Sequence, residues 1–163
     1  MIAYSVGASG QVVILTEAAM ETFRRHRQKR WYQREAGGQL FARFDGGRIV
    51  IEQATGPRAS DKRSLVSFHP NRKAEQKEII DRHRDGLHYV GDWHTHREDI
   101  PQASSTDIAS IGDCVARSTH DLRAFILIVV GRAEPPDGLH VLIHDGQTCV
   151  SLDARADDPD IEQ

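Results

Sequence analysis

The 163-residue sequence lacks the features of disulfide-rich secreted proteins and of membrane-spanning proteins. Its two cysteines, Cys114 and Cys149, are too few for a disulfide framework and are not spaced as a C-x-x-C pair. The longest strongly apolar run, residues 125–130, is too short to cross a bilayer and indicates a buried strand. The N-terminus lacks the basic start and apolar stretch of a signal peptide. These absences predict a reduced, cytoplasmic protein.

A large excess of either charge is also missing. The net charge is −3 with histidine neutral, so the composition does not indicate a nucleic-acid binder or a basic membrane-surface protein. Hydrophobic residues make up 39% of the chain, an ordinary share for a globular domain with one core. We expect a single domain over residues 1–152, followed by an acidic, disordered tail over residues 153–163.

Apolar periodicity and turn signals predict strands and helices in mixed order. The expected strands are 11–15, 39–44, 48–54, 64–68, 87–93, 123–130, 139–143 and 148–151, and the expected helices are 16–34, 71–84 and 104–117. This order predicts an α/β (α+β) fold with a single mixed, mostly antiparallel sheet wrapped by about three helices.

The first two expected helices begin at capping residues, Thr16 and Asn71. Met20 and Phe23 are three residues apart and so share one face of the first helix. In the second helix, residues 79–80 are isoleucines that we expect to contact the core. The other face of the first helix is basic, which fits either a solvated surface or a docking surface for an acidic partner. The basic residues are Arg24, Arg25, Arg27, Lys29 and Arg30.

A candidate metal site lies in the segment that contains His94 and His96. Residues two apart on a strand point to the same face, so both imidazoles can reach one ion. Asp107, at the start of the next helix, can supply a carboxylate. Three such ligands leave a fourth tetrahedral position open, as in catalytic zinc sites, although manganese, iron and cobalt also accept these ligands.

Each of these residues also has a structural explanation. A His-x-His pair is often two polar positions on a solvent-facing strand, and Ser104 with Asp107 fits a helix capping box. Capping and metal binding are compatible, because a helix N-terminus can hold its cap residues and still present them to an ion.

The combined spacing resembles the signature of the JAB/MPN (JAMM) metalloproteases, the family of the proteasomal and signalosome deubiquitinating and deneddylating subunits. Glu35 is followed by His94-x-His96, seven residues, and Ser104-x-x-Asp107. The resemblance implies zinc bound by His94, His96 and Asp107, with Glu35 as the general acid/base and Ser104 as an oxyanion stabiliser. Two positions where the family often has proline differ: they are residues 97 and 103, here arginine and alanine.

Longer segments, including 61–64, 68–76 and 87–96, are similar to bacterial JAB isopeptidases encoded with cGAS-like nucleotidyltransferases in antiphage (CBASS) defence. This resemblance implies cleavage of the amide bond after the C-terminus of a ubiquitin-like or conjugated protein, which reverses conjugation of the nucleotidyltransferase. The expected partner is a protein with a flexible C-terminal tail, and neither nucleic acid nor membrane. Basic side chains that fit an acidic partner, or else a solvated loop, are Arg58, Lys62, Arg63, Arg72 and Lys73.

Three alternatives stay open at this point. The same chemistry would serve a sulfur-carrier protein, a phage-tail protein or a peptidoglycan peptide. A scaffold of the same fold would lack catalysis, but such members typically lose ligands. Amidohydrolases and metallo-β-lactamases also use His-x-His; only 67 residues follow His96, and Ile100 stands where the β-lactamase pattern needs a histidine.

Overall fold

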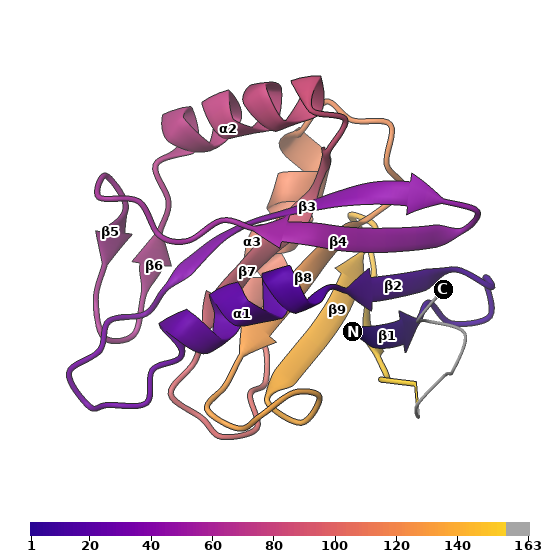
Figure 1. Cartoon of the computed structure of the whole chain (residues 1–163). Helices are drawn as coiled ribbons and strands as arrows, with labels where there is room; N and C mark the ends of the chain where they lie inside the picture. Colours follow the sequence, from indigo (N-terminus) through magenta and orange to yellow (C-terminus); the bar gives the residue numbers. More distant parts are fainter. Residues whose placement is uncertain (156–163) are drawn as a thin grey trace.

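The computed structural model describes residues 1–155, and Figure 1 shows a large twisted sheet with helices on both faces. The helices are α1 (Glu17–His26), α2 (Arg72–Arg84) and α3 (Ser105–Arg117). The strands are β1 (Ile2–Ser5), β2 (Val12–Leu15), β3 (Gly37–Asp45), β4 (Arg48–Ala54), β5 (Lys62–Arg63), β6 (Phe68–His69), β7 (His88–Thr95), β8 (Phe125–Val130), β9 (Leu139–His144) and β10 (Cys149–Leu152). The expected α/β fold class is confirmed.

Eight strands form the main sheet in the order β1-β2-β4-β3-β7-β8-β9-β10, and β5 pairs with β6 in a separate small hairpin. Neighbouring strands in the main sheet are antiparallel except for the pairs β2–β4 and β7–β8. The crossover from β7 to β8 runs through α3, as a parallel connection requires. The topology therefore places the end of β7 beside the start of α3.

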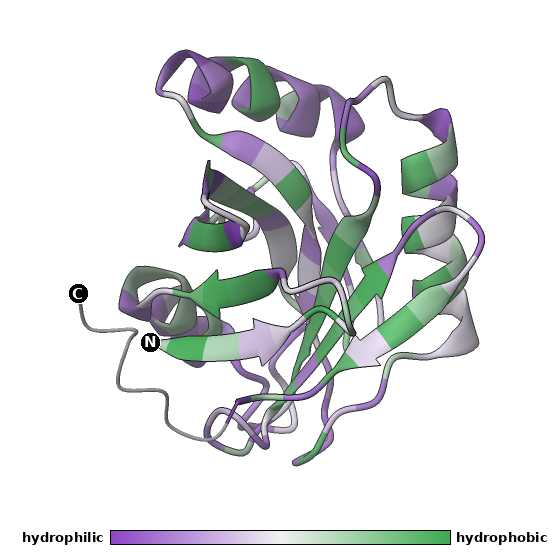
Figure 2. Ribbon diagram, turned by 90° about the vertical axis from the view of Figure 1, so that its right-hand side faces the viewer, coloured by the Kyte–Doolittle hydropathy of each residue, from purple (hydrophilic) through white to green (hydrophobic). Residues whose placement is uncertain are grey.

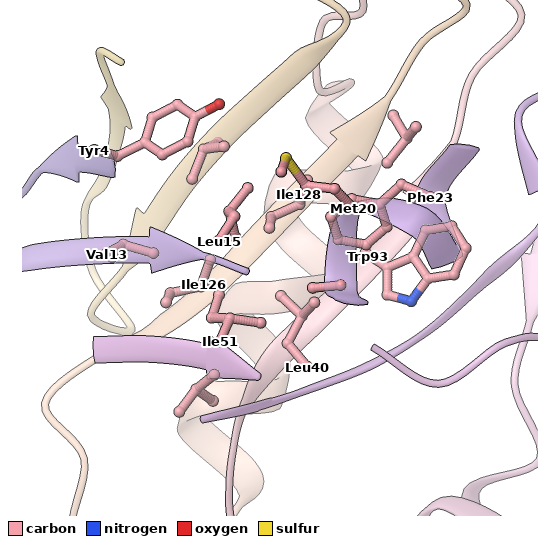
Figure 3. Close-up of a cluster of buried hydrophobic side chains, with 14 of the residues drawn as sticks. Tyr4, Val13, Leu15, Met20, Phe23, Leu40, Ile51, Trp93, Ile126 and Ile128 are labelled. Atoms are coloured by element: carbon pink, nitrogen blue, oxygen red, sulfur yellow. The ribbon is translucent and has the colours of Figure 1, made fainter. Parts of the chain in front are cut away.

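Strand β8 is buried along its whole length because both faces of the sheet are covered. On one face α1 contributes Met20 and Phe23, which pack with Trp93 and the even-numbered residues of β8; Figure 3 shows this cluster. The rings of Phe23 and Trp93 have centroids 5.0 Å apart. On the other face α3 packs Ile111 and Val115 against the odd-numbered residues of β8. Figure 2 shows the resulting contrast between apolar central strands and the mainly polar α2.

Helix α1 ends at His26, so the prediction of a helix as far as residue 34 was wrong. Thr16 caps it as expected. Arg27 leaves helical geometry, and its buried guanidinium donates to the carbonyls of Arg132 and Ala133 and pairs with Glu134. These contacts, over 100 residues away in sequence, outweigh the local helix preference. The predicted basic helix face is thereby divided, because one of its members lies inside the protein.

Asn71 caps helix α2, which ends at Arg84 as predicted, but the helix does not use both isoleucines as core residues. Ile80 is exposed, and the buried residue of α2 is Glu75. The predicted strand at 64–68 is instead mostly the turn of the β5–β6 hairpin, closed by a Ser64 N–H to Ser67 carbonyl hydrogen bond. These errors share a cause: apolar residues in a short segment do not show which of its side chains will pack against the sheet and which will face solvent.

Strand β1 was not anticipated, and it pairs with β2 at the sheet edge. The first residues assigned to the tail extend this edge, because Ala154 forms a bridge with Tyr4 and the Arg155 N–H donates to the Ala3 carbonyl. The rest of the predicted tail, residues 156–163, lies outside the described residues. Among the described residues, no helix has the length and apolar character needed to cross a membrane.

Candidate active site

Strand β7 presents His94 and His96 on the face of the sheet that α3 covers. His94 lies between β3 and β8, with Gly37 and Val129 as its register partners. Its position in the sheet interior limits how far the imidazole can move. The two Nε2 atoms, one from each histidine, are 3.2 Å apart. The two imidazoles therefore converge on one point, as the two-residue spacing predicted.

Asp107 lies in the first turn of α3 and completes a cluster with the two histidines. One carboxylate oxygen is 3.2 Å from His94 Nε2, and the other is 3.3 Å from His96 Nε2. Asp107 also accepts the backbone N–H of Ser104 at 2.7 Å, while its own N–H donates to the Ser104 hydroxyl oxygen at 3.1 Å. The capping box and the convergence with the histidines are thus present together.

The three separations fit a tetrahedral metal centre. With metal–ligand bonds of about 2.0–2.1 Å, two ligand atoms of a tetrahedron lie about 3.3 Å apart. The two Nε2 atoms are 3.2 Å apart, and His94 and His96 lie 3.2 and 3.3 Å from different oxygens of the Asp107 carboxylate. Without a cation, two imidazole nitrogens at this distance need a shared or added proton to avoid lone-pair repulsion. The donor set therefore fits a divalent transition-metal ion: zinc, or manganese, iron or cobalt, which accept the same ligands.

Glu35 is buried and lies just before β3. In sequence it precedes the two histidines, whereas Asp107 follows them. One carboxylate oxygen of Glu35 and one nitrogen from each of His94 and His96 all lie within 4.8 Å of one another. The Glu35 N–H donates to the Ser64 carbonyl at 2.8 Å, and Arg63 donates to the Glu35 carbonyl at 2.6 Å. The β5–β6 hairpin thus holds the backbone of Glu35 in place.

The site residues line a pocket of about 460 Å³ that is open to solvent; it includes Glu35, His94, His96, Ser104 and Asp107, with Val66 at its side. All five residues singled out in the sequence therefore meet in one pocket. A separate pocket of about 430 Å³ lies at the other end of the sheet, around Phe44 and Leu122. That pocket contains none of the five.

The two carboxyl groups of the site have pKa values shifted in opposite directions. Burial opposes ionisation of Asp107, but hydrogen bonds from His94 and His96 outweigh it and hold the Asp107 pKa below its usual range. Burial raises the pKa of Glu35, although the charges of the two histidines act against this. The hydrogen bond to Asp107 is the main reason that the pKa of His96 is raised. Opposite pKa shifts of this kind suit a carboxylate that stays ionised, here Asp107, and a carboxyl group that can carry a proton, here Glu35.

Comparison with known proteins agrees with this geometry. Residues 16–142 match the family described as prokaryotic homologs of the JAB domain. The chain belongs to this family. A Pseudomonas aeruginosa protein named CD-NTase/cGAS isopeptidase is 32% identical over 120 residues, which cover 72% of this chain and 75% of the relative. An Escherichia coli protein of the same name is 30% identical over 76% of this chain and 78% of its own length.

The fold comparison points the same way. A Desulfitobacterium hafniense protein with a known solution structure superposes with a TM-score of 0.62 at 20% identity, over 85% of this chain and 88% of that one. At this identity the likeness concerns the fold alone. The roles of individual residues in this JAB domain therefore follow from its own contacts.

Sequence reasoning missed two residues that support the site of this JAB domain, Thr95 and Gln28. Thr95 lies between the two histidines and points to the opposite, α1 face, where it is fully buried. Its hydroxyl accepts the Ala36 N–H at 2.9 Å and donates to Gln28 Oε1 at 2.9 Å. The link to Ala36 connects the histidine strand directly to the neighbour of Glu35. A threonine between two histidines was the available signal, but its partner is 59 residues away.

The two positions that depart from the usual prolines make specific contacts. The Arg97 guanidinium donates to the Trp31 carbonyl, so it ties the strand end to the loop after α1. The Ala103 N–H donates to His140 Nδ1 at 3.0 Å, a bond that proline could not make. His140 Nε2 in turn lies 2.9 Å from the Ser151 hydroxyl. The backbone just before Ser104 is therefore held by strand β9.

Two of the basic residues considered for an acidic partner are engaged within the protein. Arg58 donates to Gln39 Oε1 at 2.8 Å and lies 3.7 Å from a Glu78 carboxylate oxygen. Arg72 pairs with the buried Glu75 at 2.7 Å. Both guanidinium groups therefore bind within the protein, and a nearby carboxylate offsets the charge of each.

Proposed function

We propose that this protein is a zinc-dependent isopeptidase of the JAMM type, in which His94, His96 and Asp107 hold the metal. The observation that carries the proposal is the convergence of two imidazole nitrogens and the Asp107 carboxylate at separations of 3.2–3.3 Å, with the buried carboxyl group of Glu35 beside the two histidines. Family membership supports it, because the curated relatives are named isopeptidases. A structural role alone would not require Glu35 to be buried next to two imidazoles.

Zinc in this site would supply Lewis acidity, lowering the pKa of a water molecule toward about 7 and polarising the scissile carbonyl. Glu35, whose carboxyl group lies beside the two histidines, would take a proton from the attacking water and return it to the leaving amine. Its raised pKa favours this exchange, because a proton carrier works best when its pKa approaches the working pH. The Ser104 hydroxyl oxygen already accepts the Asp107 N–H, which leaves its own proton free to donate to the developing oxyanion.

For the substrate, we propose an amide bond after the C-terminus of a conjugated protein. The relatives' name, CD-NTase/cGAS isopeptidase, supports a cGAS-like nucleotidyltransferase conjugate in antiphage defence. Hydrolysis would then reverse conjugation. A ubiquitin-like sulfur carrier or a phage-tail protein would use the same chemistry and is the alternative substrate, which the experiment below distinguishes.

The test combines metal analysis with hydrolysis of fusions that carry the C-terminal tail of each candidate substrate. We expect one zinc per chain in the wild type and in Glu35→Gln, with hydrolysis by Glu35→Gln reduced by about 10²–10⁴. His94→Ala should lose both zinc and hydrolysis. Glu21→Gln, an equal change on the exposed side of α1, is the matched control and should keep both.

Two results would contradict the proposal. A purified protein that takes up no transition metal would exclude the metal centre. A zinc-loaded protein that cleaves no fusion, with Glu35→Gln indistinguishable from wild type, would instead indicate a non-catalytic scaffold. Preference for the nucleotidyltransferase tail over the sulfur-carrier and phage-tail fusions would identify the substrate class.

A further inference from the structure

Two neighbouring loops carry large apolar side chains on the outside of the protein. In the loop after α1, Trp31 is 79% exposed and Tyr32 is 54% exposed, and their rings meet edge-on with centroids 5.8 Å apart. In the β5–β6 turn, Val66 is 79% exposed and Leu65 is 39% exposed. Four such side chains in two short segments form a patch of the kind that marks interaction sites.

Hydrogen bonds join the two loops and place them beside the catalytic pocket. The Gln28 amide donates to the carbonyls of Gln33 and Leu65, at 3.1 and 3.0 Å. The Glu35 N–H donates to the Ser64 carbonyl. Val66 itself lines the pocket that contains the proposed zinc ligands. Because the loops are held in place from within, ordering them on binding would cost little entropy.

Several basic residues in and beside these loops make no ion pair, unlike most arginines elsewhere in the described chain. Arg27, at the start of the first loop, does pair with Glu134, and the charge of Lys29 also acts on that carboxylate. Within residues 1–155, no ion pair shorter than 4.0 Å is made by Lys29, Arg30, Arg34, Lys62 or Arg97. By contrast, Arg72, Lys77, Arg82 and Arg84 of helix α2 each pair with a carboxylate of the same helix. The loops beside the pocket therefore carry cations that make no ion pair, Arg30 and Arg34 among them, on a protein whose net charge is −3.

Arg63, on β5, lies close to this group of cations. Burial lowers the pKa of Arg63 and the charge of Arg34 lowers it further, while Asp61 acts in the opposite direction. Arg63 already donates to the backbone carbonyls of Glu35 and Arg34. A ligand with negative charge would offset the charge of Arg34.

We propose that this aromatic–basic surface binds an acidic segment of the protein substrate that also carries apolar side chains, and so holds the substrate while its tail enters the pocket. The surface consists of Lys29, Arg30, Trp31, Tyr32, Arg34, Leu65 and Val66. The identity of the bound molecule as substrate rests on the proposed isopeptidase function. Exposed tryptophan, tyrosine and arginine are the residue types that contribute most at protein interfaces, and the unpaired charges would speed encounter with an acidic partner.

A protein segment fits this surface better than a nucleic acid does. Trp31 and Tyr32 could stack on bases, but their rings meet each other edge-on, and Leu65 and Val66 offer aliphatic contacts that suit apolar side chains. Binding of an oligonucleotide is the competing outcome in the experiment.

The test measures binding separately from hydrolysis. Full-length Glu35→Gln protein, free of metal, is titrated into a fluorescein-labelled short peptide rich in glutamate and leucine, and anisotropy is recorded. The comparison peptide has glutamine at every glutamate. We expect the acidic peptide to bind at least about tenfold more tightly than the glutamine peptide, and Trp31→Ala or the pair Arg30→Glu/Arg34→Glu to weaken binding by at least about tenfold.

Matched controls make the same chemical changes elsewhere. Arg123→Glu alters a cation beside the apolar pocket at the far end of the sheet, and Val150→Ala removes an exposed apolar side chain on β10. Both should keep affinity within about twofold of the parent. Because Trp31 is exposed, thermal melting should show that Trp31→Ala remains folded.

Equal affinity for the two peptides, or unchanged binding by the surface variants, would overturn the inference. Tighter binding of single-stranded DNA than of the acidic peptide, lost in the same variants, would also overturn it in favour of a nucleic-acid site. Failure of the isopeptidase proposal would appear only in the zinc and hydrolysis assays, since the binding assay contains neither metal nor a functional Glu35. If wild type hydrolyses the substrate but the surface variants bind the acidic peptide as tightly as their parent, the docking surface alone would be rejected.

Discussion

The substitution Thr95→Val tests whether the buried hydroxyl between the two histidines holds the site together. Valine has nearly the same shape, so the change removes two hydrogen bonds and leaves little cavity. It leaves the Ala36 N–H and the Gln28 Oε1 atom without the partner that each has in the wild type. An unsatisfied buried polar group costs about 1–3 kcal/mol, and the added methyl recovers about 1 kcal/mol of apolar burial. Because two groups lose their partner, we expect Thr95→Val to lower the free energy of unfolding by about 1–5 kcal/mol.

Urea unfolding of the metal-free protein, followed by circular dichroism, measures this loss without a contribution from zinc binding. Thr95→Ser keeps the hydroxyl and should lose only about 1 kcal/mol, the contribution of one methyl group. In the zinc-loaded protein, Thr95→Val should also slow hydrolysis by about tenfold or more, because the Ala36 bond helps to position Glu35. A Thr95→Val protein as stable as wild type, with Thr95→Ser less stable than both, would refute this reasoning.

Three further changes have defined outcomes. His140→Leu removes the acceptor of the Ala103 N–H and should cost about 1 kcal/mol in urea unfolding, and adding Ala103→Pro, which removes the donor, should recover part of that loss. Burial, with a neighbouring carboxylate, raises the Glu75 pKa from an ordinary 4.5 to about 7, so the folded protein binds this proton more tightly than the unfolded chain. Stability should therefore fall as pH rises from 4.5 to 7, and Glu75→Gln should flatten that slope; an unchanged slope would contradict the assignment. Gly91→Ala should reduce stability by about 1–3 kcal/mol or more, because its Cβ would meet the Ile126 carbonyl oxygen at 1.8 Å and φ is +148°; thermal melting of the variant at wild-type temperature would be inconsistent with this contact.

Local signals in the sequence were enough where neighbouring residues decide the outcome. The Asn71 cap and the Ser104–Asp107 capping box start their helices where predicted, because a cap satisfies backbone N–H groups only a few residues away. The apolar run at residues 125–130 became the fully buried central strand. The spacing of His94 and His96 sufficed to predict their convergence, since alternation along a strand is a local property.

Contacts between distant segments account for the errors. Nothing near Arg27 in sequence indicates that its guanidinium will bind carbonyls at positions 132 and 133, yet those bonds end α1 at residue 26. The exposure of Ile80 and the burial of Glu75 depend on which side of α2 meets the sheet.

By itself, the sequence determined the residue types of the site, the caps of all three described helices and the strand that delivers both histidines. Only the tertiary structure decided that Glu35 would lie beside His94, 59 residues further along the chain, and beside His96. It also decided that the Thr95 hydroxyl would bind the Ala36 N–H, which joins the end of β7 to the segment before β3. Tertiary packing likewise decided which cations form ion pairs with carboxylates and which, such as Arg30 and Arg34, form none within the described residues. The physical reason is range: capping and alternation act over a few residues, whereas strand order and charge pairing are set when distant segments pack together.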